Sequence, residues 1–91
     1  MLKVLIVDDE APARRELRVL LAGFPGVQVV GDAADAAEAQ HLIGAIDYDA
    51  VFLDIQMPGL SGIDLARQLQ TQQRHPRVIF TTAHAEYAVD A

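Results

Sequence analysis

Residues 51–62 read VFLDIQMPGLSG, and an acid ends the apolar part of this stretch. Val51 to Leu53 are apolar and typical of a buried strand, and Asp54 follows them directly. A charge at the end of such a strand is costly unless another group compensates it. The neighbours that the fold brings to Asp54 therefore decide what this residue does.

Strand-like and helix-like stretches alternate along the whole chain. The apolar runs with strand character are 2–7, 27–30, 50–53 and 77–81. Each precedes a stretch that we predict to be helical, namely 12–23, 35–46, 61–70 and 85–91. Asp35 with Glu38 and Ser61 with Asp64 have the spacing of capping boxes. This alternation favours right-handed β-α-β units, that is, a parallel sheet with helices on both faces.

The first predicted helix has one apolar face and one basic face. Helical spacing puts four apolar residues together: Ala13, Leu17, Leu20 and Leu21. Three arginines fall outside that face, and we expect them to be solvated: Arg14, Arg15 and Arg18. Phe52 and Phe80 are expected in the core, and no catalytic role is assigned to His41, His75 or His84.

The composition excludes several classes of function. The chain has 91 residues, of which 52% are hydrophobic, enough for one domain with a modest core. A net charge of -6 argues against a surface that binds nucleic-acid phosphates or anionic lipid. The absence of cysteine excludes disulfides and thiolate metal sites. The run 4–7 is too short for a signal peptide or a membrane span, so we expect a cytoplasmic protein without membrane partners.

Acids follow two of the predicted strands. In a parallel sheet, the carboxyl ends of the strands meet at one edge, so Asp8, Asp9 and Asp54 should lie together. If the first and third strands are neighbours and the second lies outside the first, this edge holds a crevice where ligands usually bind. Clustered carboxylates repel one another unless a cation neutralises them, and oxygen ligands without sulfur suit Mg²⁺.

A strand-end carboxylate beside a metal also suits phosphoryl transfer. It can attack phosphorus and form an aspartyl phosphate. Such a reaction needs groups that stabilise charge on the phosphoryl oxygens. Thr81 and Thr82 end the fourth strand at the same edge, and either hydroxyl is a candidate donor.

Three stretches together resemble the receiver domains of bacterial two-component response regulators. They are VLIVDDE at 4–10, VFLDIQMPGLSG at 51–62 and VIFTTAHAEYA at 78–88. The last is similar to the LytR/AlgR subfamily, whose members usually carry a LytTR-type DNA-binding domain after the receiver. The resemblance implies a flavodoxin-like doubly wound α/β sheet with strand order 2-1-3-4. It also implies a regulator that catalyses only its own phosphotransfer from a sensor histidine kinase and its own dephosphorylation, and that switches a transcriptional output.

The resemblance also implies roles for individual residues. Asp54 would be the phospho-acceptor, and Asp8 and Asp9 would form the acidic pair, with Asp9 favoured as the direct Mg²⁺ ligand. Gln56 would offer its backbone carbonyl to the metal. Thr82, which Ala83 follows, is preferred over Thr81 as the switch hydroxyl.

The chain departs from the family pattern at its carboxyl end. The family's catalytic lysine and signalling aromatic residue belong to a fifth strand, and the 91 residues end before it. Lys3 lies at the wrong end of the first strand to replace the lysine, and Tyr87 falls in the fourth predicted helix. We therefore expect residues 1–91 to be an incomplete receiver without its effector domain, through which alone DNA would be contacted. We also expect a homodimer or an exchange of elements between copies to cover its open sheet edge.

Three other functions fit the sequence less well. A phosphatase of the haloacid dehalogenase type needs a second Asp two residues after the nucleophile, where this chain has Gln56. A non-phosphorylated interaction module would keep only the fold. Dinucleotide binding would need a glycine-rich turn, but DDEAPA follows the first strand.

Overall fold

The structure is a computed structural model, which describes residues 1–55, 57, 62–71 and 75–81. Its elements are β1 (Leu2–Val7), α1 (Ala11–Ala22), β2 (Val27–Ala33), α2 (Ala36–Ala45), β3 (Ala50–Asp54), α3 (Gly62–Gln70) and β4 (Arg77–Thr81). The helix predicted at 85–91 and its neighbour His84 lie outside the described residues, as does the predicted cap Ser61.

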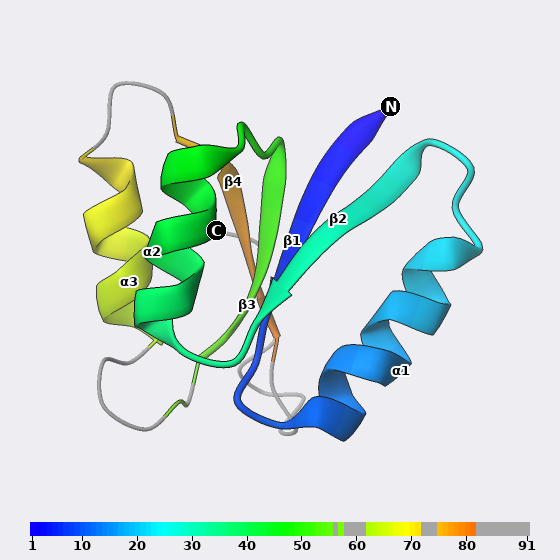
Figure 1. Ribbon diagram of the computed structural model, residues 1–91, viewed down its shortest axis with the longest axis horizontal. Coiled ribbons are helices and arrows are strands. Elements are labelled where there is room, and N and C mark those ends of the chain that lie inside the picture. Colours follow the sequence, from blue (N-terminus) through cyan, green and yellow to red (C-terminus); the bar gives the residue numbers. More distant parts are fainter. Residues whose placement is uncertain (56, 58–61, 72–74, 82–91) are drawn as a thin grey trace.

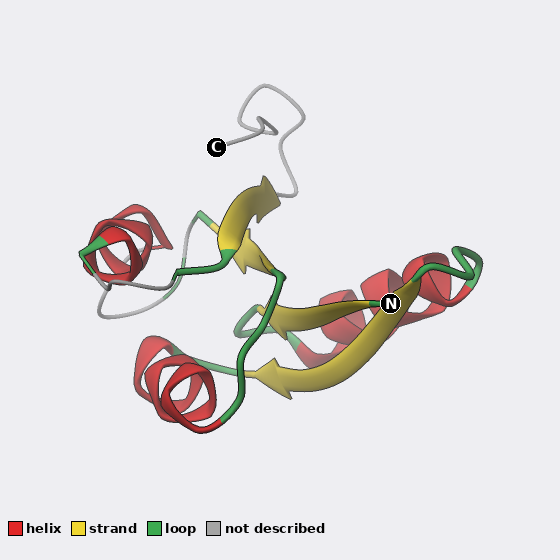
Figure 2. Ribbon diagram, turned by 90° about the horizontal axis from the view of Figure 1, so that it is seen from above, coloured by secondary structure: helices red, strands yellow, loops and turns green. Residues whose placement is uncertain are grey.

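The strands form one parallel sheet, shown in Figure 1. The order of its four strands is β2-β1-β3-β4. Figure 2 shows α1 on one side of this sheet and α2 and α3 on the other. The α/β class, the parallel sheet and the strand order 2-1-3-4 predicted from the sequence are confirmed.

The central strand β1 has a core on each of its faces. Leu5 and Val7 pack in the larger core with residues of α2, α3 and β3. Val4 and Ile6 point to the other face and pack in a smaller core with Leu21 of α1. All four residues of this run are buried, which explains why the sequence is continuously apolar rather than alternating. The aromatic residues predicted as core, Phe52 and Phe80, are half-buried and pack against the smaller and the larger core, respectively.

Strand β2 is longer than the sequence pattern predicts. It continues beyond Val30 to Ala33, and Gly31 and Asp32 pair with Leu5 and Ile6 of β1. Both residues are typical of turns, so the pattern suggested an end where the ladder continues. The extension carries the pairing to the carboxyl edge of the sheet.

Helix α2 begins and packs as predicted. The Asp35 side chain accepts a hydrogen bond from the Glu38 backbone N–H at 2.8 Å. The Glu38 carboxylate in turn accepts one from the Ala34 N–H at 3.3 Å. Ala39 is buried, and Leu42, Ile43 and Ile46 pack around the same core.

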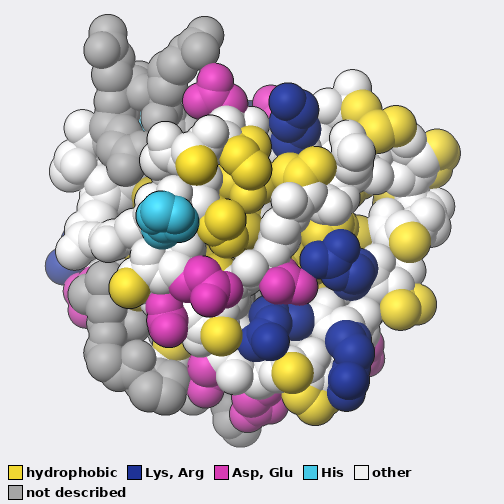
Figure 3. Space-filling view, viewed as in Figure 1, with side chains coloured by type: hydrophobic (Ala, Val, Ile, Leu, Met, Phe, Trp, Pro, Cys, Tyr) yellow, Lys and Arg dark blue, Asp and Glu magenta, His cyan; other side chains and the backbone are white. Residues whose placement is uncertain are grey.

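Helix α1 differs from its prediction on both of its faces. Leu21 is buried, but Leu20 is 61% exposed, so the apolar face is narrower than four residues. Two of the three arginines contact other elements. Arg14 donates from Nη1 to the Asp8 carbonyl oxygen at 2.7 Å, and Arg18 pairs with Asp32 at 3.0 Å. Figure 3 shows Lys and Arg side chains gathered over α1, beside acidic side chains.

The hydroxyl of Tyr48 is buried without a hydrogen-bond partner among the described residues. The side chain is 7% exposed, and burial raises the pKa of the hydroxyl. Gly31 makes room for it, because a Cβ at position 31 would lie 2.7 Å from the Tyr48 oxygen. A buried polar group without a partner destabilises a fold.

We therefore expect Tyr48→Phe to stabilise the protein by about 1 kcal/mol, because it removes the unpaired hydroxyl and keeps the ring. Urea denaturation measures the change in the free energy of unfolding. Tyr48→Leu is the control, since it removes the hydroxyl together with ring packing and should destabilise. A loss of stability in Tyr48→Phe would mean that the hydroxyl has a partner.

Candidate acidic site at the carboxyl edge of the sheet

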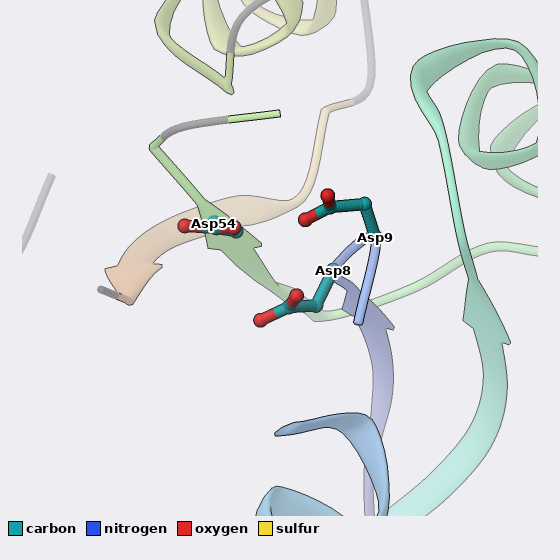
Figure 4. Close-up of side chains that lie close together, drawn as sticks. All are labelled: Asp8, Asp9 and Asp54. Carbon is teal, nitrogen blue, oxygen red and sulfur yellow. The ribbon is translucent and has the colours of Figure 1, made fainter. Parts of the chain in front are cut away.

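The pairing of β1 with β3 brings the acids together. Val7 lies opposite Leu53, so Asp8 and Asp54, the next residue of each chain segment, leave the sheet side by side. Side chains alternate along a strand, so Asp8 shares the face of Ile6 and Asp54 shares the face of Phe52. One carboxylate oxygen from each of Asp8, Asp9 and Asp54 lies within 4.8 Å of the other two. Figure 4 shows these side chains at the ends of β1 and β3. The predicted clustering is therefore present.

Asp8 is held at three of its atoms. Its N–H donates to the Ala33 carbonyl at 3.0 Å, and its carbonyl oxygen accepts from Arg14. Its carboxylate oxygen Oδ1 accepts from the Glu10 N–H at 2.9 Å. Asp8 is half-buried and Asp9 is exposed. These three hydrogen bonds fix the backbone of the turn that follows β1.

Burial raises the pKa of Asp8 above its ordinary value of 3.8, and the adjacent Asp9 carboxylate adds to this. The Glu10 N–H and the Arg14 charge act in the opposite direction. With a raised pKa, Asp8 stabilises the fold below pH 3.8, and this contribution is lost as the pH rises through the folded-state pKa. The ionised form of Asp8 is therefore disfavoured at this position, and a nearby cation would favour it.

Gly62 packs directly behind Asp54. Its N–H donates to the Ile55 carbonyl at 3.0 Å. A Cβ at this position would overlap the Asp54 carbonyl oxygen and lie 2.8 Å from its carbonyl carbon. The close approach of two backbones therefore explains why position 62 is a glycine. The start of α3 thereby fixes the backbone of Asp54.

Of the other residues considered for the site, the structure describes Thr81 and Lys3. Gln56 and Thr82 lie outside the described residues, so their roles stay predictions. Thr81 pairs with Asp54 across β4 and β3, and its carbonyl accepts from the Ile55 N–H at 3.2 Å. Lys3 lies at the opposite end of β1.

Arg14 is the residue at this site that the sequence analysis missed. It was predicted to lie on a solvated face, but it is half-buried and bonded to Asp8. The position of Arg14 in the sequence could have indicated this contact, because Arg14 lies one helical turn after Glu10. The Glu10 carbonyl accepts the Arg14 N–H at 3.1 Å. A long side chain at that position can reach back to the turn that precedes the helix.

The family of the chain follows from comparison with known proteins. Residues 4–91 match the response regulator receiver domain. The chain therefore belongs to this family, and it is a receiver domain of two-component signalling. Among the described residues, no helix has the length and apolar character needed to cross a bilayer.

Several relatives are regulators of greater length. The transcriptional regulatory protein BtsR of Salmonella typhi is 46% identical over 91 residues, which are 100% of this chain and 38% of that protein. The sensory transduction protein LytR of Staphylococcus haemolyticus is 43% identical over 90 residues, 99% of this chain and 35% of that protein. The chain thus spans little more than a third of the length of these relatives.

Solved structures have the same fold. The response regulatory domain of mrkE from Klebsiella pneumoniae superimposes with a TM-score of 0.82 and 34% identity, over 93% of this chain and 70% of that one. The response regulator TrrA from Thermotoga maritima, solved in complex with Mg²⁺-BeF, gives 0.83 and 33% over 96% of this chain and 74% of that one.

We expect Gly62→Ala to destabilise the protein by at least about 2 kcal/mol, because the new methyl group must displace the Asp54 backbone. Gly44→Ala in α2 is the matched control. A Cβ there meets nothing within 4 Å, so the change should be neutral or stabilising by up to about 1 kcal/mol. Thermal or urea unfolding compares the two variants. Equal effects would contradict close packing of Gly62 against Asp54.

Proposed function

We propose that this chain is the phosphorylation-controlled receiver of a response regulator, with Asp54 as phospho-acceptor. The observation that carries the proposal is the approach of three carboxylates to within 4.8 Å at the strand ends. In the reaction, an Asp54 oxygen attacks the phosphorus of a phosphohistidine on a sensor kinase. A P–O bond forms as the P–N bond breaks, and the electron pair of that bond returns to the imidazole, which takes up a proton.

The donor set fits a hard divalent cation. It consists of carboxylate oxygens from Asp8, Asp9 and Asp54, and burial already disfavours the ionised form of Asp8. We propose that these residues hold Mg²⁺, with Asp9 as a direct ligand and the Gln56 backbone carbonyl as a further one. When bound, Mg²⁺ offsets the charge of the carboxylates and of the phosphoryl oxygens.

The chain itself contributes to the reaction by restricting the position of the nucleophile, Asp54. Asp54 is the last residue of a strand, and its surroundings are tied by the Ile55 N–H to Thr81 and by the Gly62 N–H to Ile55. Phosphoryl transfer depends mainly on positioning and on stabilisation of charge, so a rigid nucleophile at a sheet edge suits it.

We assign the switch to the Thr82 hydroxyl, which would donate to a phosphoryl oxygen on Asp54. Thr82 directly follows Thr81, the residue that pairs with Asp54. A phosphate that binds one arrangement of this segment better than another shifts the population toward it. This differential interaction is the energetic link between the modification and a partner.

The output proposed for the full protein is transcriptional. Relatives that share this receiver are named as transcriptional regulatory proteins and are much longer than this chain. We propose that residues 1–91 are the receiver part of a cytoplasmic regulator whose LytTR-type domain contacts DNA. We propose that copies of the chain associate as a homodimer or by exchange of elements.

Incubation with Mg²⁺ and acetyl phosphate should add one phosphoryl group to the chain, measured by intact mass. Asp54→Asn should remove this gain and leave the fold intact, because only the nucleophilic oxygen is lost. Asp49→Asn, at the opposite edge of the sheet, is the control and should label normally. Labelling of Asp54→Asn would exclude Asp54 as acceptor.

Thr82→Ala should accept the phosphoryl group but respond to it weakly, since the hydroxyl that senses the phosphate is missing. The response is measured as the change in backbone amide NMR shifts on phosphorylation. Thr81→Val is the control and should respond fully. The reverse result, with Thr81→Val unresponsive, would move the role to Thr81.

A further inference from the structure

One cation of α1 is bonded to the acidic turn itself. Arg14 lies in the helix that begins at Ala11, directly after this turn. Its Nη1 donates to the Asp8 carbonyl oxygen at 2.7 Å, and both the residue and the bond are partly buried. A hydrogen bond from a guanidinium at this distance belongs to the stronger class.

This bond acts on the backbone between the acids. The Asp8 carbonyl belongs to the peptide that joins Asp8 to Asp9, and the Asp8 N–H is already held by Ala33 of β2. With both ends of residue 8 held, the direction in which the two carboxylates leave the turn is restricted. Asp9 follows this peptide directly and is exposed.

We infer that Arg14 is a positioning residue for the cation at this site. By holding the Asp8 carbonyl, it keeps the Asp8 and Asp9 carboxylates turned toward Asp54 and so raises the affinity for Mg²⁺. The inference rests on the proposed function, because it supposes that these three acids bind the cation. Arg14 of α1 is not itself a ligand of the cation.

The direction in which the Mg²⁺ affinity changes distinguishes a positioning role of Arg14 from an effect of its charge. A positive side chain beside the cluster repels a divalent cation, so removal of the charge alone would strengthen Mg²⁺ binding. Removal of a group that orients the ligands would weaken it, on the order of tenfold. Arg14 carries the charge and also orients the ligands, and we expect the loss of orientation to dominate in its variants.

The same helix offers two matched controls. Arg15 is the next residue and is exposed, so Arg15→Met removes an equal charge without touching the Asp8 carbonyl. Arg18 binds Asp32 across exposed surface, with 46% and 39% of the two side chains exposed. Arg18→Met therefore loosens α1 from the sheet without acting on the acidic turn.

The test is calorimetric titration of the chain with Mg²⁺ alone, together with urea unfolding of each variant. Arg14→Met keeps the apolar stem and a good helix former, and we expect its Mg²⁺ dissociation constant to rise about tenfold. Arg14→Lys, which keeps a donor and the charge, should recover part of the affinity. Arg15→Met and Arg18→Met should bind within about twofold of the original chain, even where stability falls.

The Mg²⁺ dependence of labelling by acetyl phosphate gives a second readout. The Mg²⁺ concentration for half-maximal rate should rise for Arg14→Met, while the rate at saturating Mg²⁺ stays unchanged. Unchanged or tighter Mg²⁺ binding in Arg14→Met would overturn the inference. If that variant does not fold, Arg14→Gln takes its place with the same two outcomes. Failure of the original chain to bind Mg²⁺ would instead overturn the proposed function.

Discussion

The parallel pairing of β1 with β3 is the constraint on which the acidic site depends. Because Val7 lies opposite Leu53, the next residues, Asp8 and Asp54, lie side by side at the same edge of the sheet. A shift of the register by one residue would turn Asp54 to the other face, since side chains alternate along a strand. The buried residues on both faces of β1 resist such a shift. The hydrophobic core thus determines the geometry of the charged site.

The same strand order explains why the site lies where it does. With β2 outside β1 and β3 on its other side, the connections leave β1 and β3 toward opposite faces of the sheet. Helix α1 follows β1 on one face, and α3 follows β3 on the other. The carboxyl edge between β1 and β3 therefore lies where the described helices change sides, which is the place where doubly wound sheets bind ligands.

The sequence was sufficient for features that repeat locally and insufficient for those that depend on contacts between distant elements. Strand composition, helix spacing and the Asp35 cap are local, and they predicted the parallel sheet and the clustering of Asp8, Asp9 and Asp54, whereas the strand order was implied by the resemblance to receiver domains. The predicted end of β2 was wrong because pairing with β1 outweighs the turn preference of Gly31 and Asp32. Met57 is 8% exposed and packs in the larger core, although Gln56 and Pro58 flank it in the sequence. Such burial is decided by the surrounding fold rather than by neighbouring residues.

The electrostatics of the site combine two opposing requirements. A cation site needs carboxylates that are close together and ionised, but burial, and to a lesser extent the charge of Asp9, raises the pKa of Asp8. Backbone N–H groups and a positively charged side chain on the adjacent helix can stabilise the ionised form of Asp8 without occupying the space between the acids. The Glu10 N–H and Arg14 are such groups, because one binds the carboxylate oxygen Oδ1 of Asp8 and the other binds its backbone carbonyl. A divalent cation held as proposed would offset the charge of these carboxylates, and the hydrogen bonds of the turn would limit the reorganisation that binding requires.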